Sequence, residues 1–259
     1  MNKFALVVKQ DDHSHHIAAK IKTALCEGGW TFDLEKAELV ICVGGDGTIL
    51  QAVHQYMDQL QDVQFLGVHT GTLGFLTDYT QNELEEVIQA ILTTEPEVYE
   101  SKLLEITAYG KEVKRYYALN EMRIENVIRT QILEISIDEE PFEICRGSGV
   151  CLSTQAGSTA YNRSLRGAVI DSGLSIMQLC EITGIQNSLH RSLNVPYIMT
   201  DTRTVAFRSH TFDEATLCYD HLHASLEGIK KVTCRMSNKK VIFSRYRPYS
   251  YLKRLKNLY

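Results

Sequence analysis

The first hundred residues alternate between strand-like and helix-like patterns of hydrophobic positions. Short apolar runs predict buried strands at 4–8, 39–43 and 64–68. Between and after these runs, apolar residues recur at three- and four-residue spacing, which predicts helices over 17–25, 48–60 and 84–92. Strands that alternate with helices form parallel sheets, so this part of the chain is predicted to be an α/β domain.

After Pro96 the pattern changes to a period of two, with apolar and polar residues alternating over 133–137 and 232–236. Such alternation is typical of strands with one buried face, and it predicts a strand-rich second domain. We therefore expect an α/β domain with a parallel, Rossmann-like sheet over 1–98, a β-rich domain over 99–244 and a C-terminal segment over 245–259.

Composition narrows the class of protein. The 259 residues carry a formal charge of −5, whereas a general nucleic-acid-binding domain normally has a net basic face. No apolar stretch approaches a membrane span, and the apolar run at the N-terminus is too short for a signal peptide. The seven cysteines are scattered, without the paired spacing of a zinc or redox site. We expect a cytoplasmic protein with mostly buried thiols and neither a nucleic-acid nor a membrane partner.

Two clusters of ionisable residues receive a structural interpretation. The basic tail over 245–256 is predicted to be a solvated helix face that holds the C-terminal segment, in preference to a phosphate or nucleic-acid patch. His13, His15 and His16 lie in a polar stretch where the first helix begins, with no convergent cysteine or acid. We interpret them as an exposed start of that helix rather than as a metal site.

The segment 40–50 runs from an apolar strand through three glycines and one acid into a helix. Gly44, Gly45 and Gly47 can take positive φ and let backbone N–H groups converge on an anion, while Thr48 opens the helical pattern. This favours polyphosphate at the positive end of the helix. An acid beside phosphates needs another task, so Asp46 is predicted to hold a metal, accept a proton, or both. The alternative is a tight turn in which Asp46 caps the helix.

Further motifs follow in a fixed order. A second glycine-rich segment, 66–76, leaves the next strand and is predicted to form another wall of the cleft. Asn120-Glu121 follows a strand-like run, and Gly157-Ser158-Thr159-Ala160-Tyr161 comes later. Together with Gly-Gly-Asp-Gly-Thr, this ordered set resembles the NAD kinase family over nearly the whole chain. The first motif alone also occurs in phosphofructokinases and in diacylglycerol and sphingosine kinases, so the two later motifs separate these families.

The resemblance carries expectations for fold and reaction. It implies a β-sandwich-like second domain, a tail that returns to the first domain, and assembly into homodimers or homotetramers. It also implies transfer of the γ-phosphoryl group of ATP to the 2′-hydroxyl of the adenosine ribose of NAD. Asp46 would accept the hydroxyl proton, and the glycine loop with Mg²⁺ would hold the donor phosphates, the metal being bound to phosphate oxygens and water.

The expected binding residues lie in the second domain. An amide can pair with an adenine edge and a carboxylate with ribose hydroxyls, so Asn120 and Glu121 suit an adenosine. Without the other motifs, an Asx-type turn is the alternative for this pair, and a core aromatic is the alternative for Tyr161. The further NAD contacts that the resemblance implies are Arg146, Ser148, Thr159, Ala160, Tyr161, Ser164, Thr183 and His221.

Two positions depart from the family pattern. Ser148 stands where Gly-Asp-Gly is usual, and Gln155-Ala156 replace Pro-Thr before Gly157. The first change removes a charged acceptor and the second loosens a turn, so both bear on affinity or dinucleotide preference. Two rival functions follow: a lipid or sugar-phosphate kinase with the same glycine loop, and an NAD-binding regulatory protein that has lost turnover.

Overall fold

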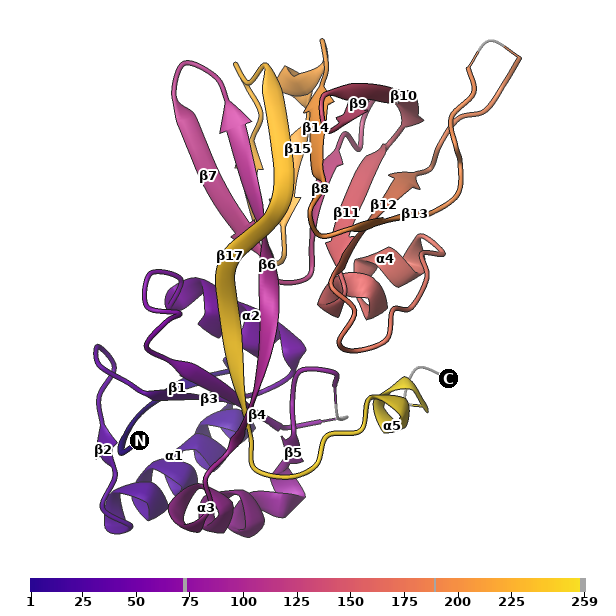
Figure 1. Ribbon diagram of the computed structural model, residues 1–259. Coiled ribbons are helices and arrows are strands. Elements are labelled where there is room, and N and C mark those ends of the chain that lie inside the picture. Colours follow the sequence, from indigo (N-terminus) through magenta and orange to yellow (C-terminus); the bar gives the residue numbers. More distant parts are fainter. Residues whose placement is uncertain (72–73, 189, 257–259) are drawn as a thin grey trace. The chain divides into compact units, whose positions relative to one another are not determined.

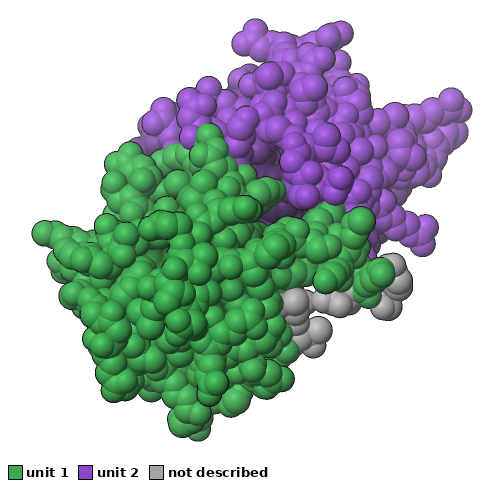
Figure 2. Space-filling view, turned by 60° about the horizontal axis from the view of Figure 1, so that its bottom comes forward, with its two compact units in different colours: residues 1–101, 239–259 green, residues 102–238 purple. Residues whose placement is uncertain are grey.

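The structure is a computed structural model that describes residues 1–71, 74–188 and 190–256 (Figure 1). The chain divides into two compact units, Met1–Ser101 with Lys239–Tyr259 and Lys102–Asn238 (Figure 2). Strands β6 (Glu97–Tyr109) and β17 (Lys231–Arg245) each contribute residues to both units. The boundaries expected from sequence, at 98/99 and 244/245, fall within these two strands.

The first unit is an α/β domain built on parallel strands. Strand β3 pairs in parallel with both β1 and β4, and β4 pairs in parallel with the end of β17, which confirms the predicted parallel α/β arrangement. The elements of this unit besides β6 and β17 are β1 (Lys3–Val8), α1 (Asp12–Glu27), β2 (Thr31–Phe32), β3 (Leu39–Val43), α2 (Asp46–Gln55), β4 (Gln64–His69), β5 (Tyr79–Thr80), α3 (Leu84–Thr93) and α5 (Tyr251–Leu255).

Strand β3 is buried at all five positions because helices cover both faces of the sheet. Leu39, Ile41 and Val43 point to one face and join the core formed with α1 and α3. The intervening Val40 and Cys42 are also fully buried, and α2 packs on β1, β3 and β4. The segment after Val43 therefore leaves a rigid strand at its carboxyl end, where ligands bind in such sheets.

Helix α2 differs from its predicted bounds at both ends. It begins at Asp46, two residues before Thr48, and it ends at Gln55, before the apolar pattern reaches Leu60. Tyr56 and Leu60 are nevertheless buried, because the chain folds into turns there and the Tyr56 hydroxyl donates to the carbonyl of Leu34 at 2.9 Å. Tyr56 and Leu60 therefore continue the apolar spacing of a helix, although they lie in turns.

The second unit is rich in β-strands, as expected, and contains one short α-helix. One sheet has the order β13-β12-β11-β8-β15-β16 and is antiparallel throughout, and β10, β9, β14 and β17 form a second antiparallel row. Buried side chains from both share one core, such as Leu152 and Phe207. The elements are β7 (Val113–Ala118), β8 (Glu121–Glu125), β9 (Gln131–Ile137), β10 (Glu140–Gly147), β11 (Gly149–Thr154), α4 (Tyr161–Ser164), β12 (Ile176–Ile182), β13 (Tyr197–Thr200), β14 (Thr204–Arg208), β15 (Thr216–Tyr219) and β16 (Leu222–Ser225).

The histidine cluster and most of the cysteines lie as the sequence predicted. His13, His15 and His16 are exposed in the first turns of α1, as predicted for the start of a helix. Five of the seven cysteines are buried, while Cys26 is exposed and Cys218 is half-buried. No helix among the described residues is long and apolar enough to cross a membrane.

The basic tail fits its predicted role as a solvated helix face only in part, since Lys253 and Lys256 are exposed but the three arginines are ion-paired. Arg245 and Arg254 are buried, with 7% and 6% of their surface exposed, and both contact the buried carboxylate of Asp78. Arg247 pairs with Glu83 at 2.5 Å. Arginine is rarely buried unless it is paired, and here the partners come from a segment about 170 residues earlier in the chain. The tail is therefore an ion-paired part of the first unit.

Candidate active site

The glycine loop of the first unit joins β3 to α2. Gly44 has φ of 156°, and a Cβ atom there would collide with the Thr48 side chain, so this position requires glycine. Gly45 is the N-cap of α2 in extended conformation, and Gly47 lies inside its first turn. Of the three glycines, which can all take positive φ, only Gly44 does so. The loop places the N-terminus of a ten-residue helix at the end of a buried strand.

Asp46, the first residue of α2, is half-buried and held by a neighbouring turn. Its Oδ2 accepts a hydrogen bond from the N–H of Phe75 at 2.8 Å, and its Oδ1 accepts from the N–H of Leu76 at 3.1 Å. A Cβ atom at Gly74 would collide with the carboxylate. The second glycine-rich segment thus forms a wall beside Asp46, although its residues 72–73 lie outside the described part of the chain.

His69 lies in the second glycine-rich segment and neighbours the glycine loop, although no sequence pattern marked it as a site residue. Its Nδ1 accepts a hydrogen bond from the N–H of Gly71 at 2.6 Å, which leaves Nε2 to carry the proton of the neutral ring. Nε2 lies beside Gly45. Burial lowers the pKa of His69, and the charge of Asp46 opposes that shift. A histidine at the end of a strand gives no periodic signal, so only the structure could place it here.

The Asn120-Glu121 pair forms a buried corner between β7 and β8. The Asp220 carboxylate accepts hydrogen bonds from the N–H groups of Leu119 and Asn120, both at 2.8 Å. Asn120 Oδ1 and Glu121 Oε2 are buried and have no hydrogen-bond partner in the described chain. An Asx turn would use that amide oxygen as an acceptor, so the Asx-turn alternative is not what forms this corner.

The same corner carries a perturbed carboxyl group. Burial, and after it the negative charge of Asp220, raises the pKa of Glu121 to about 7, while Arg123 and the N–H of Tyr161 act in the opposite direction. Perturbed carboxyl groups of this kind gather at functional sites. Asp220 was missed from sequence because it lies 100 residues beyond Asn120 and reaches it only through the fold.

The Gly157–Tyr161 motif packs directly on this corner. The Thr154 hydroxyl donates to the carbonyl of Leu119 at 2.6 Å, and a Cβ atom at Gly157 would collide with the Asn120 carbonyl. The motif therefore needs glycine to approach the corner. Tyr161 opens the short helix α4, and its half-exposed ring lies 4.0 Å from the Arg123 guanidinium, measured to the ring centroid.

The remaining residues of the motif are positioned as follows. Thr159 and Ala160 are half-buried, and the exposed Ser164 donates its hydroxyl hydrogen to the Tyr161 carbonyl at 2.6 Å. Gln155, one of the two departures from the family pattern, donates to the Ile170 carbonyl at 3.0 Å. That contact gives the glutamine a structural task in the turn where proline is usual.

A second group of expected contacts gathers at the ends of β10 and β12. The N–H of Ser148 donates to the Ile182 carbonyl at 2.8 Å, next to Thr183, which has φ of 51°. Arg146 Nε is buried without a hydrogen-bond partner in the described chain. Ser164 and Thr183 line one pocket of 740 Å³. His221, the loosest of the expected contacts, is exposed beside Asp220 in the turn between β15 and β16.

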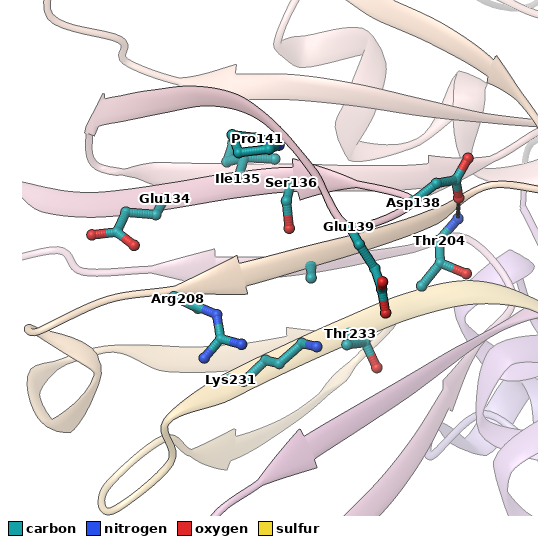
Figure 3. A pocket seen from close by; sticks show the side chains of 11 residues that line it. Glu134, Ile135, Ser136, Asp138, Glu139, Pro141, Thr204, Arg208, Lys231 and Thr233 are labelled. Carbon is teal, nitrogen blue, oxygen red and sulfur yellow. Dashed lines mark hydrogen bonds between the residues drawn. The ribbon is translucent and has the colours of Figure 1, made fainter.

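Another pocket of the second unit, of 560 Å³, contains none of the expected residues. Its lining comes from β9, β10, β14 and β17 and from the turn after β9, and it mixes acids such as Glu134 with the bases Arg208 and Lys231 (Figure 3). The candidate site of the second unit consists instead of segments that meet in space: Asn120-Glu121, Gly157–Tyr161 and Asp220.

Comparisons with known proteins agree with these motifs. The family described as ATP-NAD kinase N-terminal domain matches residues 3–96. An NAD kinase of Geobacillus stearothermophilus is 38% identical over 258 residues, covering 98% of this chain and 95% of the relative. NAD kinase 1 of Halalkalibacterium halodurans is 35% identical over 257 residues, covering 98% and 97%. The chain therefore belongs to the NAD kinase family.

Two solved structures share the fold. The yeast NADH kinase complexed with NADH superposes with a TM-score of 0.85 at 18% identity, covering all of this chain and 87% of that one. An NAD kinase from Archaeoglobus fulgidus in complex with ATP gives a TM-score of 0.76 at 22% identity, covering 99% and 96%. They confirm an α/β unit followed by an antiparallel β unit.

Proposed function

We propose that this protein is an NAD kinase, which transfers the γ-phosphoryl group of ATP to the 2′-hydroxyl of the adenosine ribose of NAD and yields NADP and ADP. The observation that carries the proposal is the pair of buried, unpartnered acceptors Asn120 Oδ1 and Glu121 Oε2. Buried acceptors without donors cost free energy, and the amino group of adenine and the hydroxyls of ribose supply such donors.

Asp46 is the proposed proton acceptor. Phosphoryl transfer requires positioning, neutralisation of phosphate charge and a partner for the hydroxyl proton. The two N–H groups that hold Asp46 fix its carboxylate while leaving further lone pairs for an incoming O–H. Gly44, Gly45, Gly47 and Thr48 at the start of α2 form the proposed cradle for the phosphates of ATP. Within it, the N–H groups of Gly44 and Thr48 already donate to the carbonyls of Val68 and Gly45.

Mg²⁺ fits this loop as an ion that arrives with ATP. The described residues contain no group of three or more His, Cys, Asp or Glu side chains that could hold a metal by themselves. Mg²⁺ at phosphate sites uses one or two carboxylates, phosphate oxygens and water, and Asp46 is the carboxylate at the loop. When bound, the ion supplies positive charge to the donor phosphates.

The NAD contacts are proposed for the second unit. Asn120 and Glu121 receive the adenosine, and the Tyr161 ring with Thr159 and Ala160 forms the wall beside it. Ser164 and Thr183, which share a pocket, and Arg146, Ser148 and His221 contact the rest of the dinucleotide. The unpartnered Arg146 Nε is a donor suited to phosphate or amide oxygens.

One assay tests this function against its rivals. Purified protein with ATP, Mg²⁺ and NAD is expected to form NADP stoichiometrically with ADP. Phosphorylation of a lipid or a sugar phosphate without phosphorylation of NAD would support the first rival. Binding of NAD in calorimetry without any turnover would support the regulatory protein.

Assembly and location complete the proposal. We expect a homodimer or homotetramer in the cytoplasm, where the free, mostly buried cysteines stay reduced. Light scattering coupled to gel filtration measures the subunit number, and a monomer over the working concentration range would contradict it.

A further inference from the structure

The carboxylate of Asp46 is oriented by two consecutive peptide units. The first unit joins Gly74 to Phe75 and donates its N–H to Oδ2 at 2.8 Å, and the second joins Phe75 to Leu76 and donates to Oδ1 at 3.1 Å. The side chain of Asp46 therefore follows any rotation of these peptides. Gly74 also lies against the carboxylate of Asp46, so closely that no larger residue fits at position 74.

The C-terminal segment binds the opposite ends of the same two peptide units. The Arg254 Nη1 donates to the Gly74 carbonyl at 2.8 Å, and the Tyr249 hydroxyl donates to the Phe75 carbonyl at 3.0 Å. Each peptide thus receives a hydrogen bond at its C=O from the tail and gives one from its N–H to Asp46. Hydrogen bonds in such chains polarise one another, and a cationic donor strengthens the next link.

The two tail residues are themselves held rigidly. Arg254 is 7% exposed in its side chain, and its Nη2 lies 3.5 Å from Oδ1 of Asp78. The Tyr249 ring lies 4.0 Å from the guanidinium of Arg245 and 5.2 Å from that of Arg254, measured to the ring centroid. Ser250 caps α5 by accepting from the N–H of Lys253 at 3.3 Å. A donor held this firmly can determine the orientation of the peptide that it contacts.

We propose that Tyr249 and Arg254 are positioning residues for Asp46, and that they act through the peptides 74–75 and 75–76. The inference rests on the proposed role of Asp46 as proton acceptor. A general base contributes fully only when its oxygen is held in reach of the proton, so loosening either tail contact lowers turnover without altering contacts to NAD.

The test is a double-mutant cycle between Tyr249→Phe and Asp46→Asn. Tyr249→Phe keeps the ring and removes one hydrogen bond, so kcat is expected to fall roughly tenfold while the KM for NAD stays within about twofold. In the Asp46→Asn background the same change should have no further effect, because the group that it positions is already lost.

Tyr246→Phe is the matched control, since Tyr246 lies in the same segment but packs against the core of the first unit. It should leave kcat unchanged. An equal loss from Tyr249→Phe in both backgrounds, a rise in KM alone, or no loss in kcat would overturn the inference. Wild-type protein that forms no NADP would instead overturn the proposed function, so the two failures are distinguishable. Melting temperatures of all variants check that each is folded.

Discussion

Asp46 in the first unit and Glu121 in the second are both proposed to act on the substrates, yet their carboxylates have opposite surroundings. Both oxygens of Asp46 accept backbone hydrogen bonds, and the residue is half-exposed. Glu121 is 5% exposed, and its Oε2 has no partner among the described residues. One group is fully oriented by the protein, whereas the other has unused hydrogen-bonding capacity.

This difference fits the two proposed tasks. A proton acceptor must be correctly oriented before the substrate arrives, and backbone donors hold it in that orientation. A recognition group gains most from a ligand when the protein leaves its acceptors unpaired, because the ligand then removes the cost of burial. We infer that removal of the first group affects turnover, while removal of the second affects binding and its pH dependence.

The largest expected effect is that of Asp46→Asn. This change keeps the shape of the side chain but removes its basicity, so kcat should fall by roughly a hundred- to ten-thousand-fold. NAD should still bind, which calorimetric titration can measure beside the rate of NADP formation. Full activity in this variant would refute the role of Asp46 as proton acceptor.

Glu121→Gln should change how stability depends on pH. The pKa of Glu121 is about 7 in the folded protein, against an ordinary value of 4.5, so the folded protein holds this proton more tightly than the unfolded chain. The resulting stabilisation is fully present below pH 4.5 and is lost as the pH rises through about 7. Across that window the loss is on the order of 3 kcal/mol, as an upper estimate.

Urea unfolding of wild-type and Glu121→Gln protein between pH 5 and pH 8, roughly spanning that window, measures this effect. As the pH rises, the free energy of unfolding of the wild type should fall relative to that of the variant. Parallel curves for the two proteins would contradict the raised pKa of Glu121.

Asn120→Ala is expected to have a smaller effect, on NAD binding. It removes one hydrogen bond to the adenosine, so the KM for NAD should rise roughly tenfold, with a lesser change in kcat at saturation. Initial rates at varied NAD and varied ATP measure this. A change confined to the KM for ATP would place the corner on the donor side and contradict the assignment.

Sequence patterns predicted the parts of the fold whose burial is repeated along the chain. Strand β3 was recognisable because all five of its positions are apolar, and β9 because its apolar residues alternate. Helix α2 was predicted too long because Tyr56 and Leu60 continue the apolar spacing in turns. Periodicity reports which residues are buried, and only indirectly which backbone conformation buries them.

The candidate site was predictable where its chemistry lies in one short segment. The glycine loop around Asp46 and the Asn120-Glu121 pair could be read from the chain itself, whereas Asp220 and Arg254 could not. Arg254 contacts Gly74, which lies 180 residues earlier, and its burial reverses the usual expectation for a basic residue in a tail. Such contacts depend on tertiary pairing, which no local pattern encodes.

The smallest expected effect is that of Ser148→Asp, which restores the acid usual in the family. The backbone of Ser148 is fixed, since its N–H donates to Ile182 and its carbonyl accepts from Asn126, both at 2.8 Å. A replacement side chain at this position therefore starts from the same backbone position. A carboxylate accepts a charge-assisted hydrogen bond where a hydroxyl offers a neutral one, a difference of about 1 kcal/mol. NAD binding should tighten several-fold at most, with little change in kcat.

Calorimetric titration of NAD into both proteins, paired with initial-rate kinetics, measures this prediction, and Ser148→Asn is the control that adds a similar volume without charge. Weaker binding by the Ser148→Asp protein would mean that the pocket is built around a hydroxyl, and the contact expected from the family would then be wrong at this end of the dinucleotide. A rise in turnover by orders of magnitude from a negligible wild-type level would favour the regulatory protein over the enzyme, because the loss of one acceptor would then have silenced an intact Asp46.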